Sequence, residues 1–378
     1  MKIACIASSA IPSATANSIQ VMKVCQALQQ VGGAVRLWVP GKYFTDWVQL
    51  ADFYGLTTSF EIEWVRASRF WKRYDLAWKS VELAQRWGAD MIYTWMMQSA
   101  VLALWRGLPV ILELHDRPSG RVGPWLFREF IRHPGRKRLL VITEALLERV
   151  QQEYHMQLPQ EWVQIAPNGT ELERYENLPQ PEEARRQLGL PQMPTVVYSG
   201  SFYAGRGLDL LLHLARDFPL VMFLWIGGRP QDVAGWKKRL SDMGLRNVHL
   251  TGFVENSRLP LYQAAGDVLL MPYERAIAGS SGGNSAEICS PMKMFDYLAC
   301  GRPILASDLP VFHEVLNDNN AVFCPPQDTA LWSKTLEALL ADADRRQRLG
   351  EQAKADSARY TWRERAGRAL ADFLINLD

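Results

Sequence analysis

Residues 279–310 read GSSGGNSAEICSPMKMFDYLACGRPILASDLP, a small-residue loop followed by a short amphipathic run and an apolar run. Ser290 is the predicted N-cap of a helix, and Pro291 suits its first helical position. The spacing predicts that helix over Met292–Ala299 and a buried strand over Ile304–Ala306. A helix that begins after such a loop offers backbone N–H groups and the positive end of its dipole. The sequence therefore predicts an anion site, with phosphate or diphosphate as the natural anion.

Two charged side chains lie on one face of this predicted helix. Lys293 and Asp296 are three residues apart, so both project from the same side. Helical side chains lean toward the N-terminus, which lets Lys293 reach a phosphate, while Asp296 could accept hydrogen bonds from a ribose. A surface Lys–Asp pair on an ordinary capped helix has the same spacing, so the residues alone leave both interpretations open.

Length and composition indicate a globular chain of two domains. A chain of 378 residues is long for a single core. Its 48% hydrophobic and 22% charged residues are ordinary for a globular protein, and a net charge of +2 argues against a dedicated nucleic-acid binder. The five cysteines form no CxxC pair, which favours reduced thiols and no zinc site. No signal peptide or long apolar span is visible, so we expect a cytoplasmic protein.

The order S-P-x-K-x-F-D-Y-x-A-x-G-x-P within residues 290–303, followed by A-S-D-x-P, resembles the donor-site signature of one enzyme family. This family comprises the retaining, GT-B-fold glycosyltransferases of family 4, which include glycogen-synthase-like and sucrose-phosphate-synthase-like enzymes. The resemblance implies an α/β GT-B fold, in which two Rossmann-like doubly wound domains face a central cleft. It also implies that the anomeric configuration is retained and that neither a metal nor another cofactor is needed.

Alternation of strands and helices in the first half fits the first of these domains, which we expect to span residues 1–178. A strand over Lys2–Ser8 and a helix over Ser18–Gln30 begin a βαβ unit without the G-x-G-x-x-G fingerprint. The family usually carries glycines in this first loop, where the backbone approaches the donor and the acceptor. The residues that the resemblance places there, on the acceptor side, are Ser13, Ala14 and Thr15.

A strand predicted over Val110–Leu114 ends at His115 and Asp116. Active sites of open α/β sheets lie at the carboxyl ends of strands. The resemblance places His115 beside the transferred sugar, with Asp116 next to it on the acceptor side. Glu113 shares the face of His115 while the strand lasts. It could orient the imidazole or form a buried ion pair elsewhere, and the sequence leaves both open.

The segment Trp125–Arg138 mixes aromatic and basic residues. A solvated basic face with an apolar underside explains this composition. A weak contact with an anionic membrane surface, or with an acidic acceptor, explains it as well. A peripheral membrane location is therefore the alternative to a purely cytoplasmic one.

A segment rich in Pro, Glu and Gln over Glu173–Pro194 marks the predicted domain boundary, and the second domain is expected to span residues 179–360. In its first loop the family offers one Arg and one Lys to the donor diphosphate. This chain has Ser201 at the first of these positions and Arg206 at the second, and arginine can bind phosphate in a bidentate way. Residues 361–378 are expected to form a final helix that packs back on the first domain.

The resemblance assigns catalysis to three residues, His115, Arg206 and Lys293. His115 would position the sugar or the acceptor hydroxyl, and the two cations would meet the charge that grows on the diphosphate leaving group. Relatives often carry two glutamates separated by seven residues at the donor site, and the first of these positions is Ile288 here. The expected donor-binding residues are Gly200, Ser201, Arg206, Arg229, Phe253, Val254, Ser290, Pro291, Met292, Lys293 and Asp296.

We therefore expect a metal-independent hexosyltransferase whose donor is a nucleotide-diphosphate sugar, with UDP-glucose favoured. The expected acceptor is a hydroxyl of a sugar or sugar phosphate, or of a glycan or lipid-linked sugar, and no nucleic-acid partner is expected. The substitution at Ser201 and the broken glutamate pattern also suit a non-catalytic nucleotide-sugar-binding protein of the same fold. A GT-B nucleotide-sugar epimerase is the third interpretation.

Overall fold

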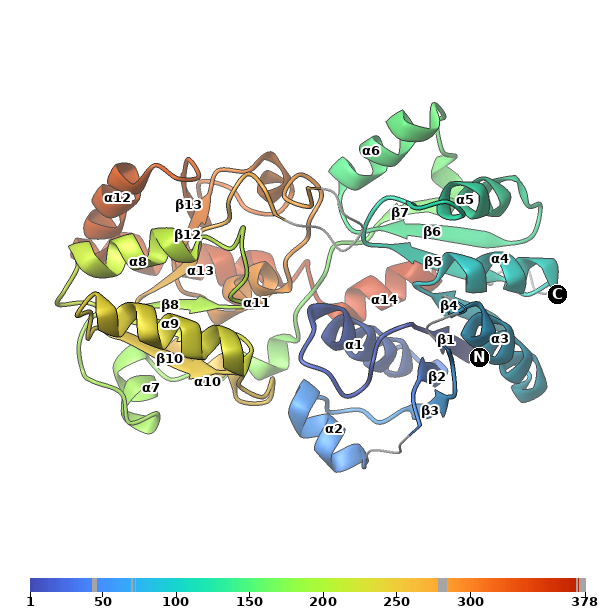
Figure 1. The fold of residues 1–378 in the computed structure, drawn as a ribbon, viewed down its shortest axis with the longest axis horizontal. Helices are drawn as coiled ribbons and strands as arrows, with labels where there is room; N and C mark the ends of the chain where they lie inside the picture. The colour runs from blue at the N-terminus through green and yellow to red at the C-terminus, as the bar shows by residue number, and fades with distance from the viewer. Residues whose placement is uncertain (43–45, 69–70, 72, 278–283, 372, 374–378) are drawn as a thin grey trace. The chain divides into compact units, whose positions relative to one another are not determined.

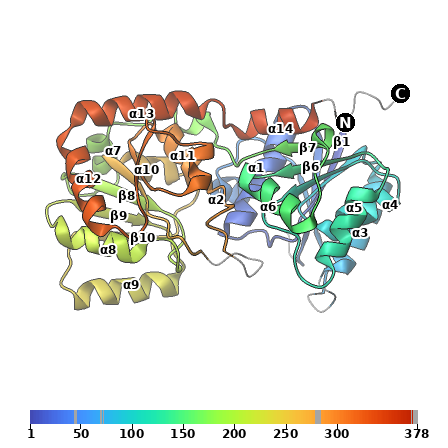
Figure 2. The ribbon, with the colours of Figure 1, turned by 90° about the horizontal axis from the view of Figure 1, so that it is seen from above.

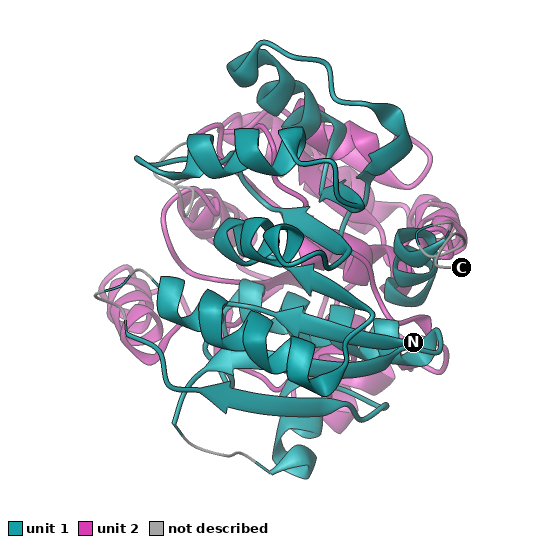
Figure 3. Cartoon of the chain, turned by 90° about the vertical axis from the view of Figure 1, so that its right-hand side faces the viewer, with its two compact units in different colours: residues 1–168, 362–378 teal, residues 169–361 magenta. Residues whose placement is uncertain are grey.

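The computed structural model describes residues 1–42, 46–68, 71, 73–277, 284–371 and 373 of the chain (Figure 1). It divides into two compact units, which Figure 3 shows in different colours. Unit 1 contains Met1–Asn168 and Trp362–Asp378, and unit 2 contains Gly169–Thr361. The Ser/Gly run predicted to precede the phosphate site, residues 279–283, lies outside the described residues.

Unit 1 is built on a seven-stranded parallel sheet with the order β3-β2-β1-β4-β5-β6-β7. Its strands are β1 (Lys2–Ile6), β2 (Ala34–Pro40), β3 (Glu61–Val65), β4 (Met91–Thr94), β5 (Val110–Leu114), β6 (Lys137–Val141) and β7 (Val163–Ile165). The direction of chain progression reverses between β1 and β4, which is the position where open α/β sheets bind ligands. All five residues of β5 are buried, including Glu113, so the sequence must supply partners for a buried carboxylate.

Helices cover both faces of this sheet. They are α1 (Ala16–Gln30), α2 (Trp47–Tyr54), α3 (Tyr74–Trp87), α4 (Met97–Trp105), α5 (Gly123–Arg132), α6 (Glu144–Tyr154) and α14 (Trp362–Leu370). On one face α1 packs against α14, and on the other α4 packs between α3 and α5. Figure 2 shows α14 on one side of the sheet and α3, α4 and α5 on the other.

Unit 2 is built on a six-stranded parallel sheet with the order β10-β9-β8-β11-β12-β13. Its strands are β8 (Thr195–Ser199), β9 (Met222–Ile226), β10 (Val248–Gly252), β11 (Val268–Met271), β12 (Ile304–Ser307) and β13 (Ala321–Cys324). Its helices are α7 (Pro181–Gln187), α8 (Leu208–Asp217), α9 (Pro230–Asp242), α10 (Leu259–Ala264), α11 (Met292–Cys300), α12 (Thr329–Ala341) and α13 (Ala343–Ser357). The sheet lies between α8 and α9 on one side and α13 on the other (Figure 2). The order reverses between β8 and β11, so this sheet has the same kind of switch point as the first.

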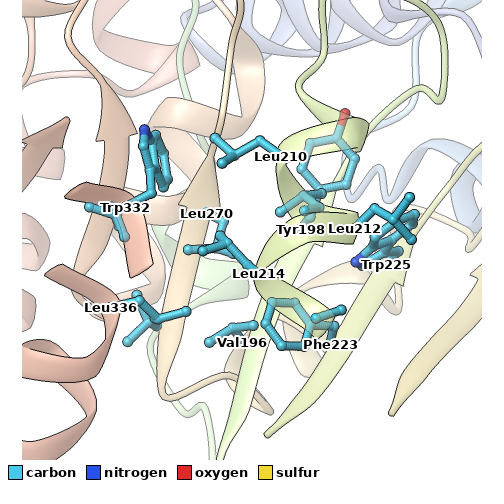
Figure 4. Packing of buried hydrophobic residues seen from close by; sticks show 14 of the residues in the cluster. Val196, Tyr198, Leu210, Leu212, Leu214, Phe223, Trp225, Leu270, Trp332 and Leu336 are labelled. Atoms are coloured by element: carbon cyan, nitrogen blue, oxygen red, sulfur yellow. The ribbon is translucent and has the colours of Figure 1, made fainter. Parts of the chain in front are cut away.

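The core of unit 2 joins its sheet to α8 and α12. Phe223 and Trp225 of β9 pack with leucines of α8, and Trp332 and Leu336 of α12 close the cluster (Figure 4). Tyr198 of β8 belongs to this cluster as well, and its side chain is fully buried. Because interiors are close-packed, the core holds the ring of Tyr198 in place at the end of β8.

The predicted fold class, two Rossmann-like α/β domains, is confirmed. The strand Val110–Leu114 has the predicted bounds. Helix α11 begins at Met292, as predicted, but its N-cap is Pro291 and not Ser290, because Pro291 has an extended backbone (ψ 126°) and is not part of the helix. Ser290 therefore lies outside the helix, and Pro291 provides no side-chain cap.

The division between the units falls at Asn168 and Gly169, earlier than the predicted boundary at residue 178. The Thr170 N–H donates to the carbonyl of Tyr360 (2.9 Å), which ties this stretch to unit 2. The Pro-rich segment that follows is ordered structure of unit 2, where α7 packs on α10 and the buried Arg185 pairs with Asp267 at 3.1 Å. The segment from Trp362 onward is grouped with unit 1, where α14 packs against α1.

Candidate functional site

The loops that follow β8, β9 and β11 pack tightly at the carboxyl edge of the unit 2 sheet. Gly207, at the end of the loop after β8, has φ +71°, and a Cβ there would lie 1.6 Å from the carbonyl oxygen of Pro272. Gly227, after β9, has φ +112°, and a Cβ there would lie 2.3 Å from the carbonyl oxygen of Gly200. Glycine at these two positions brings three loops together at the switch point.

The ammonium group of Lys293, on the first turn of α11, lies among aromatic rings. Its Nζ is 3.8 Å from the centroid of the Tyr198 ring and 5.3 Å from that of Tyr273. This Nζ is buried and has no hydrogen-bond partner among the described residues. Burial lowers the pKa of Lys293 well below its usual range, and the nearby charge of Arg206 lowers this pKa further. A buried cation in this state is stabilised by an anion, and the described residues supply none here.

Arg206, in the loop after β8, is the second cation of this cluster. Its Cζ lies 4.7 Å from the ring centroid of Tyr203 and 4.8 Å from that of Tyr273, and the guanidinium donates to the Tyr203 hydroxyl. The Tyr273 ring therefore contacts both cations. Within the described part of the chain, neither Lys293 nor Arg206 forms an ion pair with a carboxylate. We call Lys293, Arg206 and their three tyrosine neighbours, Tyr198, Tyr203 and Tyr273, the cation cluster.

The start of α11 lies beside this cluster because Lys293 is its second residue. The helix has nine residues and no side-chain cap, so its N-terminal N–H groups and its dipole add to the positive potential around Nζ. Pro291 and Met292 are partly buried, and Ser290 is buried. Together with two cations, this helix start is suited to a diphosphate.

The remaining expected donor residues occupy the same edge of the sheet. Gly200 follows β8, and a Cβ there would lie 2.7 Å from Lys293 Nζ. Ser201 is exposed, and its carbonyl accepts a hydrogen bond from the Tyr198 hydroxyl (2.8 Å). Arg229 follows β9 and is exposed, and it pairs with Asp232 at the start of α9 (2.8 Å). Phe253, 38% exposed, and Val254 follow β10.

Asp296, one turn beyond Lys293, has a partner inside unit 2. Its Oδ1 accepts a hydrogen bond from the Thr170 hydroxyl at 3.0 Å. Asp296 thus links the first residues of unit 2 to α11. The expected contact between Asp296 and a ribose stays a prediction.

The second expected centre, around His115, lies at the carboxyl edge of the unit 1 sheet. His115 is 30% exposed, and its Nε2 lies 2.6 Å from Oε1 of the fully buried Glu113. The same oxygen accepts from Nε2 of Gln20 on α1 (2.6 Å) and pairs with Nη2 of Arg365 on α14 (2.6 Å). The Tyr93 hydroxyl, on β4, donates to Oε2. We call these five residues the Glu113 cluster.

The charges around Glu113 determine which atoms of the Glu113 cluster carry protons. Burial alone would raise the pKa of Glu113, but Arg365 and His115 outweigh burial and lower this pKa to about 2. Glu113 is therefore a carboxylate at neutral pH and can only accept hydrogen bonds. It follows that Nε2 of His115 carries a proton, and in the neutral imidazole Nδ1 is then the atom that accepts a hydrogen bond from a hydroxyl.

The first loop of unit 1 is held by its own contacts. The Ser13 N–H donates to the Tyr54 hydroxyl of α2 (2.7 Å), and this hydroxyl donates back to the Ser13 carbonyl (3.1 Å). Thr15 is the N-cap of α1, and Ala14 between them is exposed. The loop follows β1 and His115 follows β5, so both lie at the same edge of the sheet. Asp116 accepts a hydrogen bond from the N–H of Arg117 (2.8 Å).

Neither a metal cluster nor a membrane-spanning helix is present in the described part of the chain. Across the residues that the structure describes, no three His, Cys, Asp or Glu side chains are grouped so that they could hold a metal ion. All five cysteines are free. In that same part of the chain, every helix is too short or too polar to cross a membrane.

Both halves of the chain match family models of sugar-transferring enzymes. Residues 18–174 match the model described as "Glycosyltransferase Family 4", and residues 193–342 match "Glycosyl transferases group 1". The two halves are glycosyltransferase domains of the GT-B type.

Three individual proteins illustrate how far this similarity extends. The D-inositol 3-phosphate glycosyltransferase of Xylanimonas cellulosilytica is 27% identical over 323 residues, which are 80% of this chain and 70% of that protein. The sucrose-phosphate synthase of Thermosynechococcus elongatus superposes with a TM-score of 0.74 at 20% identity, over 97% of this chain and 96% of the other. HepE of Anabaena, crystallised with UDP and glucose, superposes with a TM-score of 0.75 at 16% identity, over the full length of both chains.

Several residues of this glycosyltransferase that shape the two clusters were missed by sequence reasoning. Arg365 was assigned only to a terminal helix, although its guanidinium neutralises Glu113 and donates to the carbonyl of Pro167 (2.9 Å). Tyr198 lies near the end of β8 and Tyr273 lies just after β11, where a tyrosine has no local signal that distinguishes a core ring from a ring at a site. One signal could have predicted the Glu113 cluster. Glu113 and Gln20 are polar residues in a strand and a helix that are otherwise apolar, and buried polar groups need hydrogen-bond partners.

Proposed function

We propose that this glycosyltransferase transfers a hexosyl group, with retention of the anomeric configuration, from UDP-glucose to a hydroxyl of a sugar phosphate. The single observation that supports it best is the buried ammonium of Lys293, which has no counter-ion among the described side chains and lies beside Arg206 and the start of α11. A nucleotide diphosphate supplies the missing negative charge. The UDP in the HepE structure and the phosphate in the names of the two other similar proteins support the choice of donor and acceptor.

The cation cluster would act on the leaving group. As the bond between the sugar and the diphosphate breaks, negative charge grows on the phosphate oxygens, and two cations and the helix dipole are already arranged to meet it. On the other unit, Nδ1 of His115 would accept a hydrogen bond from a sugar or acceptor hydroxyl. Glu113 holds the imidazole for this task. The proposed reaction requires no metal.

Donor identity is tested first by binding. Purified protein is unfolded by heat with and without UDP, ADP and GDP, each alone and with a sugar phosphate. A bound nucleotide at roughly 100 times its Kd should add about 2.7 kcal/mol of stability. We expect this shift for UDP. A shift for ADP or GDP alone would replace UDP in the proposal.

Transfer is tested with UDP-glucose and a panel of sugar phosphates, free sugars and lipid-linked sugars, with UDP release and product mass as readouts. Lys293→Met and Arg206→Met should each lose about 2–4 kcal/mol of transition-state stabilisation, roughly 30- to 900-fold in kcat/KM. Lys238→Met is the matched control, because that lysine is exposed and pairs with Asp242 on the surface of unit 2. NMR of the product reports the anomeric configuration, and excess EDTA tests the metal requirement.

The alternatives give different results in the same assay. Ser201, at a position where relatives carry a cation, supports a protein that binds the nucleotide sugar without transferring it. Nucleotide binding without a product for any acceptor would establish that role. A new nucleotide sugar formed without acceptor would identify an epimerase. Full activity of both Lys293→Met and Arg206→Met would overturn the proposed site.

A further inference from the structure

Three tryptophans on neighbouring helices of unit 1 leave about half of their side chains in solvent. Trp78 on α3 is 56% exposed, Trp105 at the end of α4 is 53% exposed, and Trp125 on α5 is 52% exposed. Large aromatic side chains are usually more buried than this, so a group of exposed ones on adjacent elements is informative.

The three rings belong to one continuous surface. The Arg106 guanidinium lies 4.5 Å from the ring centroid of Trp78, and Arg106 directly follows Trp105 in the chain. The rings of Trp105 and Trp125 are 6.2 Å apart. Helix α4 packs between α3 and α5, and both ribbon views show the three helices side by side (Figures 1 and 2). We call Trp78, Trp105, Arg106 and Trp125 the tryptophan patch.

Exposed charges around the tryptophan patch are mainly positive. The exposed cations on these helices and on the loop before α5 are Lys79, Arg86, Arg121, Arg128 and Arg132. The acidic residues of α3 and α5 are Asp75, Glu82 and Glu129, all partly buried. Each of them already has a local partner, since Asp75 and Glu82 pair with Lys79 and Arg86, and Glu129 accepts from the indole of Trp105 at 3.0 Å. The face therefore presents rings and a surplus of cations.

Part of the segment Trp125–Arg138 is engaged elsewhere in unit 1. The guanidinium groups of Arg136 and Arg138 each lie 5.4 Å from the ring of Phe373. Nη1 of Arg138 also donates to the carbonyls of Ala369 and Ala371 (both 2.7 Å). These cations hold the C-terminal segment, so any surface contact must use the outward face of α3, α4 and α5.

We propose that the tryptophan patch docks unit 1 on the surface of a bilayer that contains anionic lipid. Indole rings prefer the membrane–water interface, because the ring is apolar and its N–H is polar. Surrounding cations add attraction to anionic headgroups, about fivefold per residue near the surface. Three half-exposed rings offer roughly 300 Å², well under the ~800 Å² that each partner of a stable protein complex buries. A small aromatic patch ringed by one sign of charge fits a charged lipid surface better than another protein.

The test is co-sedimentation of the full chain with vesicles of phosphatidylcholine alone and of phosphatidylcholine with phosphatidylglycerol, roughly 2:1. The wild type should bind the mixed vesicles, bind them less in high salt, and bind pure phosphatidylcholine weakly. The triple variant Trp78→Ser, Trp105→Ser, Trp125→Ser should reduce partitioning by at least about tenfold. The double variant Arg121→Glu, Arg132→Glu should reduce binding to the mixed, anionic vesicles and leave the weak binding to pure phosphatidylcholine unchanged.

Unit 2 provides matched controls for both variants. Leu220, Met243 and Leu331 are exposed apolar residues there, and their triple change to serine should leave vesicle binding unchanged. Lys237→Glu with Lys238→Glu is the control for charge reversal, because both lysines are exposed on α9. Circular dichroism and thermal unfolding confirm that each variant is folded.

Three outcomes would overturn the proposal. The first is a wild type that fails to sediment with mixed vesicles at low salt, and the second is a tryptophan variant that binds them as well as the wild type does. A concentration-dependent dimer in light scattering that the tryptophan variant abolishes would instead assign this face to a second copy of the chain. Vesicle binding does not depend on the proposed sugar transfer, so each proposal can fail without the other.

Discussion

The Glu113 cluster in unit 1 and the cation cluster in unit 2 handle buried charge in opposite ways. In the Glu113 cluster a carboxylate is surrounded by Arg365, His115, Gln20 and Tyr93, so opposite charges meet and both carboxylate oxygens are paired. The cation cluster contains two positive groups, three tyrosines and no carboxylate ion pair in the described residues. The first cluster is complete without a ligand, and the second becomes electrically balanced when an anion enters. Loss of a residue should therefore affect folding in one cluster and ligand binding in the other.

The strongest test of this difference is Arg365→Met. Removing one partner of a buried ion pair leaves Glu113 as an uncompensated charge, so unit 1 should lose about 3–5 kcal/mol of unfolding free energy. Urea unfolding at neutral pH measures it. Arg359→Met is the control, because Arg359 is 64% exposed in its pair with Asp356 and should change stability by less than about 1 kcal/mol. Equal small losses in both variants would contradict a stabilising role for the Glu113 cluster.

Acid should weaken the same cluster in a defined pH range. The pKa of Glu113 is lowered from its ordinary 4.5 to about 2, so the folded state holds its proton less tightly than the unfolded state. The stability from this group is therefore complete above pH 4.5 and is lost as pH falls to about 2, by roughly 3 kcal/mol. Urea unfolding of the wild type and of Glu113→Gln across this pH range measures the contribution of Glu113 to the free energy of unfolding. Parallel curves would show that Glu113 does not titrate there.

Lys293→Met should have the opposite effect on stability from Arg365→Met. Replacing a buried, unpaired cation by an apolar side chain of similar length should raise the stability of the free protein by about 1–3 kcal/mol while nucleotide binding is lost. The pKa of Lys293 is lowered in the folded state, so the wild type binds fewer protons folded than unfolded, and its stability rises with pH across that interval. The variant should lack this rise. Destabilisation by Lys293→Met at neutral pH would mean that the ammonium already has a counter-charge.

Gly200→Ala should give the smallest effect. A Cβ at residue 200 would lie 2.7 Å from Lys293 Nζ, and φ at this residue is +148°, so the ammonium must shift. Because the tip of a lysine side chain moves easily, we expect UDP binding to weaken by only about 1 kcal/mol. Calorimetry should show this as a roughly fivefold increase in the Kd for UDP. Gly235→Ala is the control, since nothing lies within 4 Å of a Cβ at that position in α9. An unchanged Kd would place the bound diphosphate away from Nζ.

Sequence reasoning predicted the parts of this molecule that depend on local pattern. Both parallel sheets follow from short apolar runs separated by helical spacing, and the position of Lys293 on a helix start follows from the Pro and the periodicity around it. The N-cap was placed one residue too early because proline suits both the cap and the first helical position.

What sequence reasoning could not predict depends on contacts between distant residues. The pairing of Glu113 with Arg365 joins a strand near the middle of unit 1 to a helix that follows all of unit 2, and no local spacing encodes it. The domain boundary was predicted at residue 178 instead of residue 169, because composition suggested a linker where α7 in fact packs on α10. Pro-rich composition indicates a turn-rich segment, and only packing decides whether such a segment belongs to a domain.

The late position of Arg365 has a consequence for how the protein is made. Domains fold as units while the ribosome is still adding residues, usually the N-terminal one first. Here unit 2 is one continuous stretch, whereas unit 1 lacks α14 until all of unit 2 has been translated, and Arg365 follows its neighbour Tyr93 by 272 residues. Unit 1 therefore begins to emerge from the ribosome before unit 2 but is completed after it, and Glu113 gains its counter-charge only once the whole of unit 2 has been translated.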